Sequence, residues 1–333
     1  MPRFPARALP LVVLTLALAG CGGNENALAP KSAPARAISR LWWWTAAGAS
    51  IGFTVVCALL LLGWFRRNRS GLPFGGGDRA GTALVVGLGI VVPVVVLSGL
   101  FFWSDTVVLN STAAPSAKST RMTVRVIGHQ WWWEVRYDGS KAVTANEIHI
   151  PVRVPVAVVG TTDDVIHSFW IPELNRKIDL IPGRSNRVLL EADEPGTYRG
   201  ECSEFCGLQH AHMTATVVAQ PADQFRAWLA NMARPARAPA GAQAQRGRTA
   251  FLTEGCGACH QLRGTPAHAN VGPDLTHLRT RTTLAAGTIP NDTAHLAAWI
   301  ADPQHYKPGN RMPALELSGA DFGAVLAYLE SLE

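Results

Sequence analysis

Two long apolar runs dominate the first third of the chain. Leu41–Phe65 and Gly81–Trp103 each exceed 20 residues and contain no charged side chain, which is enough for a helix to cross a bilayer of about 30 Å. The loop between the runs carries the arginines Arg66, Arg67, Arg69 and Arg79. Because positive charge favours the cytoplasmic side, the pattern predicts a two-pass transmembrane hairpin over residues 41–105 with both termini outside the cytoplasm.

A third apolar run, Leu9–Ala19, follows two arginines and leads through small residues to Cys21. This order is typical of a secretory signal peptide, and its end resembles the bacterial lipoprotein cleavage box. We expect a lipoprotein-type signal peptide at residues 1–20, lipidation of Cys21 and a tether at residues 21–40. The alternative is an uncleaved signal in which Cys21 is an ordinary buried thiol. Export predicts a protein of the bacterial inner membrane whose soluble domains are periplasmic.

Short β-rich segments, separated by turn residues, fill much of residues 118–232. This spacing is typical of an antiparallel sandwich or barrel, and a short helix, Ala222–Ala233, is expected to close the domain. The expected strands are Met122–Ile127, Trp131–Tyr137, Glu147–Ile150, Val154–Gly160, Val165–Trp170, Arg187–Leu190, Thr197–Glu201 and Thr214–Val218.

The composition fits a membrane-anchored chain better than a nucleic-acid-binding one. Of 333 residues, 48% are hydrophobic and only 16% are charged, against about 25% charged in average soluble proteins. The net charge is +6, but the excess of Lys and Arg lies in residues 1–80, beside the apolar runs. The remainder is close to neutral and long enough for two domains, so we expect membrane lipid as a partner and no nucleic acid.

The segment from Cys202 to Met213 contains two thiols, two imidazoles and a thioether, and His167 stands upstream. Sulfur ligands combined with imidazole select copper. A single blue copper would need one cysteine, so the pair Cys202 and Cys206 suits two coppers bridged by two thiolates.

Three other interpretations of this segment stay open. The two cysteines could form a disulfide outside the cell, or they could bind zinc together with histidine. His212 could also be the imidazole ligand in place of His210. The remaining thiol of this part of the chain, Cys57, lies inside an apolar run and is expected to be a packing residue.

The segment Cys-Ser-Glu-Phe-Cys-Gly-Leu-Gln-His-Ala-His-Met, with His-Ser-Phe upstream, resembles subunit II of haem–copper cytochrome c oxidase. The two-pass hairpin and the run Gly-His-Gln-Trp-Trp-Trp at 128–133 are similar to the same family. The resemblance covers residues 41–220 and implies an all-β, cupredoxin-like Greek-key domain with a binuclear copper A centre. The ligands that it implies are His167, Cys202, Cys206, His210, Met213 and the backbone carbonyl of Glu204.

Three further positions gain a meaning from this resemblance. In the family, the carboxylate at Glu204 also binds Mg or Mn at the boundary with subunit I; the alternative is a solvated acid. Trp131 matches the tryptophan at which electrons arrive, although an aromatic residue on a strand can also serve packing. Val86 stands where the family has a glutamate at the mouth of a proton pathway, which leaves proton uptake to subunit I.

Residues 233–246, rich in Pro, Ala, Gln and Arg, are expected to link to a second soluble domain at residues 247–333. There Cys256, Cys259 and His260 form the pattern Cys-x-x-Cys-His, which attaches a c-type haem through two thioethers and a proximal imidazole. A thioredoxin-like redox pair is the alternative. Helices are expected at Gly247–Thr253, His295–Ala301 and Gly319–Leu332.

Met312 is expected to be the sixth ligand of the haem iron. It is the only methionine after the haem motif, and Met/His ligation suits an electron-transfer cytochrome. The domain resembles a small all-α class I cytochrome c, in which the carbonyl of the proline, here Pro273, accepts the N–H of the proximal imidazole. The alternative distal ligands are His268, His277, His295 and His305.

The two resemblances together imply the family of subunit II of caa-type cytochrome c oxidases, with a two-helix hairpin, a cupredoxin-like domain and a cytochrome c domain. Electrons would pass from cytochrome c or a cytochrome complex to the covalent haem, then to copper A and to haem a of subunit I, where oxygen is reduced and protons are pumped. Subunit I and the other oxidase subunits are the expected partners. A copper A subunit of a nitric-oxide reductase and a copper-handling membrane lipoprotein are the alternatives.

Overall fold

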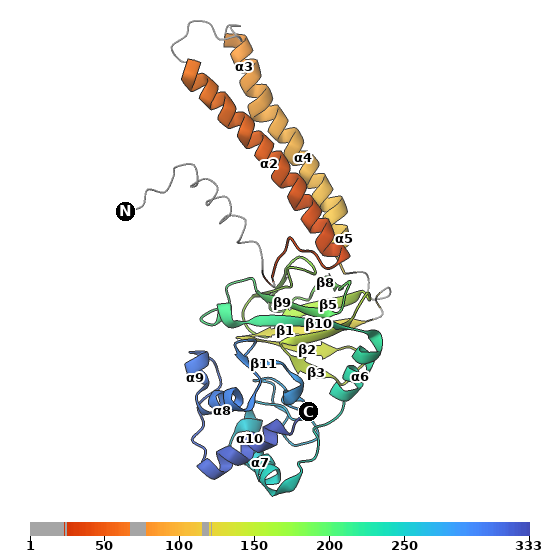
Figure 1. Ribbon diagram of the computed structural model, residues 1–333, viewed down its shortest axis with the longest axis vertical. Helices are drawn as coiled ribbons and strands as arrows, with labels where there is room; N and C mark the ends of the chain where they lie inside the picture. Colours follow the sequence, from red (N-terminus) through yellow and green to blue (C-terminus); the bar gives the residue numbers. More distant parts are fainter. Residues whose placement is uncertain (1–22, 24, 67–77, 115–119, 121) are drawn as a thin grey trace, which may run out of the picture. The chain divides into compact units, whose positions relative to one another are not determined.

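The computed structural model, shown as a ribbon in Figure 1, describes residues 23, 25–66, 78–114, 120 and 122–333. Two compact units divide the chain: Arg36–Ala113 is one, and Ala114–Glu333 with the residues up to Ala35 is the other. The predicted signal peptide, the predicted lipidation site Cys21, and the arginines at 67 and 69 lie outside the described residues.

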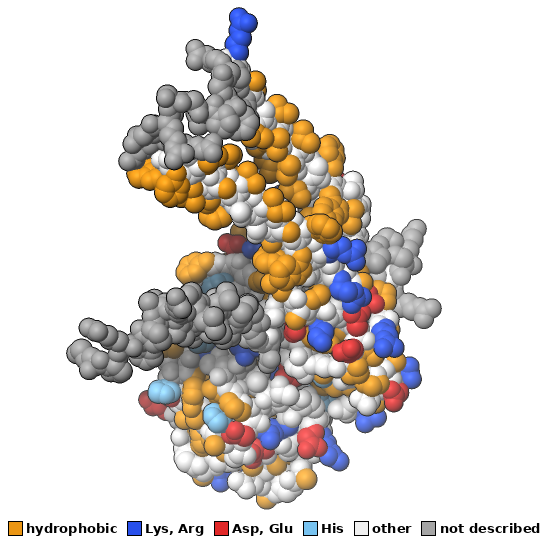
Figure 2. Space-filling model, turned by 45° about the horizontal axis from the view of Figure 1, so that its top comes forward, with side chains coloured by type: hydrophobic (Ala, Val, Ile, Leu, Met, Phe, Trp, Pro, Cys, Tyr) orange, Lys and Arg blue, Asp and Glu red, His pale blue; other side chains and the backbone are white. Residues whose placement is uncertain are grey.

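Both predicted transmembrane runs are helical. The helix α2 spans Ala33–Arg66, and the second run is one continuous helix in several parts. Their apolar side chains are exposed, as the surface of a membrane-embedded helix must be, and Figure 2 shows hydrophobic side chains covering both. The two spans are 33 and 32 residues long. The parts of the second helix are α3 (Asp78–Val86), η2 (Gly87–Val91), α4 (Val92–Trp103), η3 (Ser104–Leu109) and α5 (Asn110–Thr112).

The helices extend beyond the predicted runs at their outer ends. Helix α2 begins at Ala33, inside the stretch expected to be a tether, because the Ser32 hydroxyl accepts a hydrogen bond of 3.1 Å from the backbone N–H of Ala35 and so caps the first turn. The π-helical turn η2 ends just before Pro93, which has no N–H to donate to the preceding turn.

The β-domain, called the sandwich domain below, consists of two five-stranded sheets and the closing helix α6 (Ala222–Met232). The sheets have the orders β3-β2-β1-β5-β8 and β4-β10-β9-β6-β7. The predicted sandwich is present, but two neighbouring pairs, β1 with β5 and β4 with β10, are parallel, so the sheets are mixed and not antiparallel throughout. The strands are β1 (Thr123–His129), β2 (Trp132–Tyr137), β3 (Val143–Ala145), β4 (Glu147–Pro151), β5 (Val156–Thr162), β6 (His167–Trp170), β7 (Ile178–Leu180), β8 (Asn186–Leu190), β9 (Gly196–Cys202) and β10 (Thr214–Gln220).

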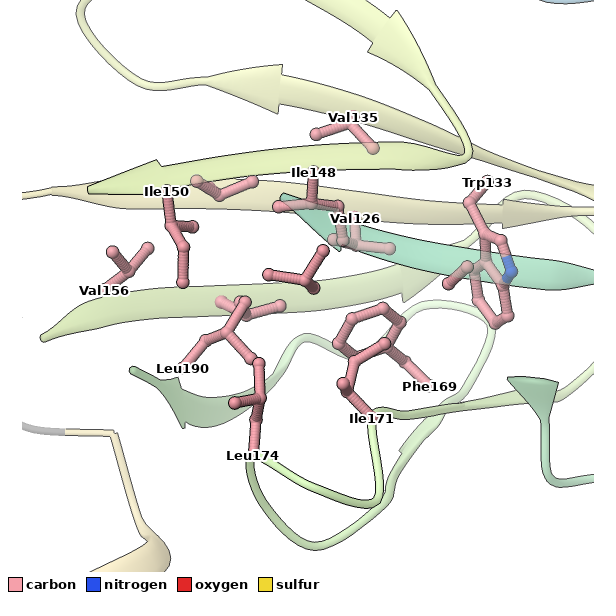
Figure 3. Packing of buried hydrophobic residues seen from close by; sticks show 14 of the residues in the cluster. Val126, Trp133, Val135, Ile148, Ile150, Val156, Phe169, Ile171, Leu174 and Leu190 are labelled. Atoms are coloured by element: carbon pink, nitrogen blue, oxygen red, sulfur yellow. The ribbon is translucent and has the colours of Figure 1, made fainter. Parts of the chain in front are cut away.

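The space between the two sheets is filled with apolar side chains from both of them. Val126 and Trp133 come from one sheet, and Ile148 and Phe169 come from the other; all four are buried, as Figure 3 shows. Burying a side chain of this size stabilises the fold by about 1.5–3 kcal/mol. The same core continues to Cys202, Cys206 and Met213, so the predicted copper ligands rest on its rigid end.

The C-terminal part, called the helical domain below, has a separate core built around the helices α7 and α10. These helices cross so closely that a Cβ at Gly247 would lie 1.9 Å from the carbonyl oxygen of Ala324. Helix α7 begins at Gly241, within the stretch predicted to be a linker. The elements are α7 (Gly241–Thr253), η5 (Cys256–Ala258), η6 (Leu278–Thr280), β11 (Thr283–Leu284), β12 (Ile289–Pro290), α8 (Thr293–Ala301), α9 (Pro303–Tyr306) and α10 (Gly319–Glu330).

Candidate metal and haem sites

Five donor side chains converge at one end of the sandwich domain. Cys202 ends β9, His167 begins β6, and Met213 directly precedes β10, while Cys206 and His210 lie in the loop between β9 and β10. The Sγ of Cys202 lies 3.8 Å from His167 Nδ1. The Sγ of Cys206 lies 3.6 Å from His210 Nδ1 and 3.9 Å from Met213 Sδ. The fold thus brings all five predicted side-chain ligands together.

The two thiols are neighbours but are not bonded to each other. Their Sγ atoms are 3.8 Å apart, whereas a disulfide bond is about 2.05 Å long. The backbone carbonyl of Glu204 lies 3.3 Å from Cys202 Sγ, and the side chain of Glu204 belongs to an exposed residue. The arrangement is therefore a pair of sulfurs with further donors on both sides.

The geometry distinguishes between the two histidines of the loop. His210 directs Nδ1 at Cys206, whereas His212 is exposed and uses its backbone carbonyl to accept a hydrogen bond from Lys307. His210 is therefore the better placed donor for a metal beside the two sulfurs.

The electrostatics of the buried sulfurs favour a bound cation. Hydrogen bonds from the thiol of Cys206 and from His167 outweigh burial and lower the pKa of the Cys202 thiol to about 3. The resulting thiolate and burial together raise the pKa of Cys206. A soft cation shared by the two sulfurs would stabilise both as thiolates, and the sulfur, imidazole and thioether donors are those that copper prefers.

Asp164 orients the predicted ligand His167. Its Oδ1 lies 2.9 Å from His167 Nε2, and its Oδ2 accepts a hydrogen bond of 2.7 Å from the backbone N–H of Gln130. Although burial opposes ionisation, these bonds and one from the backbone of Val165 lower the pKa of Asp164 to about 2. A carboxylate in this position fixes the imidazole so that Nδ1 faces the Sγ of Cys202, where it could bind a metal. Asp164 was not among the predicted site residues, although its place three residues before His167 was a usable signal.

The strand beside His167 leaves room for its ring only because residue 128 is glycine. A Cβ at Gly128 would lie 2.7 Å from Cδ2 of His167. Real Cβ atoms do not approach so closely, so a side chain at this position would displace the imidazole.

Trp131 joins the sulfur loop to a second site. Its indole Nε1 donates a hydrogen bond of 3.0 Å to the carbonyl of Cys206, and the amide of Gln130 donates one of 2.8 Å to the same oxygen. Both side chains also line a cavity that opens within the helical domain. Trp131 therefore contacts the predicted copper loop and the predicted haem site at once.

This cavity is lined by the three residues of the haem-attachment motif together with Met312. His260 Nδ1 lies 2.8 Å from the carbonyl oxygen of Pro273, as the resemblance to class I cytochromes implied. A Cβ at Gly272 would lie 2.5 Å from His260 Cε1, so this contact requires glycine. Burial lowers the pKa of His260, which favours the neutral imidazole that binds iron.

The cavity fits a large, mostly apolar cofactor with anionic groups. Its wall includes Phe251, Leu278 and Trp299, and also the buried guanidinium of Arg281. Among the described side chains, the Nε of Arg281 is a buried nitrogen without a hydrogen-bond partner. A haem has an apolar ring and two carboxylate groups, so the unpaired Nε of Arg281 could donate a hydrogen bond to a carboxylate of a haem bound in the cavity.

Met312 is better placed than the alternative distal ligands. It lines the cavity, whereas His277 uses both ring nitrogens elsewhere, at 2.8 Å from the carbonyl of Glu333 and 3.1 Å from that of Arg234. His295 is bound to Asp292. Within residues 241–333 of the described chain, His268, His277, His295 and His305 are not part of the cavity wall.

Comparison with known proteins identifies two domain families in the chain. Residues 140–220 match the family model for the periplasmic domain of cytochrome c oxidase subunit II, and residues 244–333 match the cytochrome c model. Cytochrome c oxidase subunit 2 of Alkalihalophilus pseudofirmus is 35% identical over 99% of this chain and 98% of its own length. The same subunit of Bacillus subtilis is 29% identical over 64% of this chain and 62% of its own.

The periplasmic domain of subunit II of the cytochrome oxidase of Bradyrhizobium japonicum is a similar solved structure. It is 31% identical, the match covers 36% of this chain and 96% of that domain, and the TM-score is 0.34.

These findings define the class: an electron-transfer subunit of a haem–copper oxidase, and hence part of an oxidoreductase. More particularly, because the relative from Alkalihalophilus pseudofirmus matches over nearly its whole length, the chain belongs to the cytochrome c oxidase subunit 2 family. The predicted family and the predicted multidomain fold are confirmed. Membership implies copper A, haem c, a membrane location and association with subunit I and the other oxidase subunits.

Proposed function

We propose that the chain relays single electrons from an external cytochrome c or cytochrome complex to haem a of subunit I. A covalent haem on Cys256, Cys259, His260 and Met312 would supply the first redox centre, and a binuclear copper A centre would supply the second. Oxygen reduction to water and proton pumping belong to subunit I. The ligands of the copper centre are His167, Cys202, Cys206, His210, Met213 and the carbonyl of Glu204.

The observation that carries this proposal is the double contact of Trp131. The indole donates to the carbonyl of Cys206 and lines the cavity that contains His260 and Met312. A relay needs its two centres close together, and a side chain that contacts the sulfur loop and lines the haem cavity supports such an arrangement. A protein that stores or delivers copper would have no need for a haem cavity next to its metal loop.

The membrane topology is part of the same proposal. Arg66 and Arg79, which flank the loop between the two long helices, support a cytoplasmic loop and periplasmic soluble domains. Cys21 is proposed as the lipidated residue of the mature chain. Mass spectrometry of the mature N-terminus tests this, and an intact Met1 would refute it.

Electron paramagnetic resonance of the purified oxidase tests the copper assignment. We expect a multi-line hyperfine pattern from two equivalent copper nuclei, because the thiolates of Cys202 and Cys206 would hold both metals. A four-line pattern from a single copper would falsify the binuclear centre. Assays with oxygen and with nitric oxide, run on the same preparation, distinguish an oxidase from a nitric-oxide reductase.

A further inference from the structure

Lys307 of the helical domain is buried against the sandwich domain, with 3% of its surface exposed. Its Nζ donates hydrogen bonds to three backbone carbonyls: 2.9 Å to Trp131, 2.8 Å to His212 and 3.1 Å to Ala285. The first two carbonyls belong to the sandwich domain and the third to the helical domain. An ammonium group has three donors, so all of them are used.

A buried cation is costly unless polar groups replace the water that it loses. Here the replacement is supplied from two domains, so the ammonium is fully satisfied only when they are docked as observed. Burial lowers the pKa of Lys307 to about 7. Removal of the Lys307 side chain would leave the backbone carbonyls of Trp131 and His212 without the ammonium group that donates to them.

The residues that follow Lys307 strengthen the same contact. The carbonyl of Pro308 accepts a hydrogen bond of 2.8 Å from the side-chain amide of Gln209, a buried residue. Gly309 has a φ of +81°, and a Cβ there would lie 2.8 Å from Cδ2 of Leu208. Residues 307–309 therefore lie directly on residues 208–212.

These two segments contain or adjoin the proposed ligands of both metals. Gln209 directly precedes His210, and Lys307 stands five residues before Met312 in the sequence. We propose that Lys307 is a positioning residue, which holds the Met312 loop of the helical domain against the copper loop and so fixes the separation of the two redox centres. The proposal rests on the relay function proposed above. Lys307 itself exchanges no electron: each transfer oxidises the haem by one electron and reduces the copper pair by one.

Other contacts between the two domains lie away from Lys307 and would remain if it were replaced. Glu147 Oε1 accepts from the backbone N–H of Thr282 at 2.7 Å, and Arg263 donates to the carbonyl of Lys141 at 2.6 Å. We therefore expect a Lys307 variant to fold with its domains docked, but with the two metal loops loosened.

Lys307→Met in the purified, fully loaded oxidase tests the proposal, because methionine has a similar length and no charge. Lys177→Met is the matched control: it removes the same charge from an exposed residue of the sandwich domain. We expect electron transfer from haem to copper, followed by rapid mixing, to slow about tenfold in Lys307→Met, because small displacements of reacting groups have large effects on rate. The control should match the wild type.

Hydrogen exchange gives a second measurement that does not depend on turnover. The backbone N–H of Thr214 donates to the carbonyl of Ala286 across the same contact, at 3.1 Å. Its exchange should become about tenfold faster in Lys307→Met, while exchange at Thr282 should stay near the wild-type rate. Gln209→Ala weakens the same contact from the sandwich domain. It should change the electron-transfer rate and the exchange rate at Thr214 in the same directions but by less, and it replaces Lys307→Met as the test if that variant does not fold.

Three results would overturn the proposal. The first is wild-type electron transfer in Lys307→Met, and the second is slower transfer with unchanged exchange at Thr214. The third is loss of the optical signature of methionine ligation in Lys307→Met. That loss would mean that Lys307 stabilises the fold of the helical domain itself and not its contact with the sandwich domain. Failure of the relay function itself would differ, because the wild-type protein would then show no transfer from haem to copper.

Discussion

The indole of Trp131 donates its N–H to the backbone carbonyl of Cys206, at 3.0 Å, from a position in the wall of the haem cavity. Trp131→Phe retains an aromatic ring but removes this bond, so we expect electron transfer from haem to copper to slow about tenfold while the copper content is unchanged. Rapid-mixing spectroscopy measures the rate, and metal analysis measures the copper.

Trp170→Phe is the control for this change, because Trp170 also donates its indole N–H to a backbone carbonyl, that of Asn175 at 3.0 Å. Trp170 is not part of the cavity wall among the described residues. Equal slowing in both variants would contradict a specific role for Trp131.

Asp164→Asn should weaken copper binding. The asparagine has nearly the same shape but no charge, so it holds the Nε2–H of His167 less firmly, and loss of such a partner typically lowers metal affinity about 10–100-fold. Competition with a copper chelator measures the affinity. Asp163→Asn removes a charge from the adjacent, exposed residue and should bind copper normally; comparable weakening in both variants would point to net charge as the cause.

Gly272→Ala should disturb the proximal side of the haem site. The new Cβ would lie 2.5 Å from Cε1 of His260, so the ring must move away from the carbonyl of Pro273, at a cost of about 1–3 kcal/mol in the free energy of unfolding. Denaturant unfolding followed by haem absorbance measures this loss. At Gly323, in helix α10, a Cβ meets nothing within 4 Å, so Gly323→Ala should be neutral or slightly stabilising.

Acid should weaken the contact that Glu147 makes between the two domains. Burial disfavours its charge, but hydrogen bonds from His149 and Thr282 outweigh burial and lower the pKa of Glu147 below its usual value of 4.5. The folded chain therefore binds fewer protons here than the unfolded chain. The stabilisation is complete above pH 4.5 and is lost as the pH falls through the lower, folded-state pKa.

Glu147→Gln should remove this contribution and flatten the decline of the free energy of unfolding in acid. Denaturation monitored by tryptophan fluorescence at a series of acidic pH values measures the slope. Glu254→Gln alters an exposed carboxylate of the helical domain and should leave the slope unchanged. An unaltered slope in Glu147→Gln would mean that other carboxylates cause the acid sensitivity.

Most of the candidate ligands could be picked out from the sequence because they lie close together in it. Cys202, Cys206, His210 and Met213 lie within twelve residues, and Cys256, Cys259 and His260 lie within five. His167 and Met312 lie far from these runs, so the family resemblance and elimination were needed to indicate them. The apolar runs predicted the long helices for a similar reason, since bilayer thickness sets their minimum length. The strands β3 and β7 are three residues long, too short to show an alternating pattern.

The contact between the two soluble domains could not be predicted from the sequence. Lys307 donates to the carbonyl of Trp131, which is 176 positions away, and to that of His212, which is 95 away. A backbone carbonyl is present at every residue, so the acceptor leaves no mark in the sequence. Lysine is most often a solvated surface residue, and only the three-dimensional structure shows that this one is buried.

Rapid mixing of the intact oxidase with a reduced cytochrome, recorded at haem and copper wavelengths, tests the relay most directly. We expect the covalent haem to be reduced first and then reoxidised in step with reduction of the copper pair, faster than the enzyme turns over. A haem that stays reduced while oxygen consumption continues would contradict it.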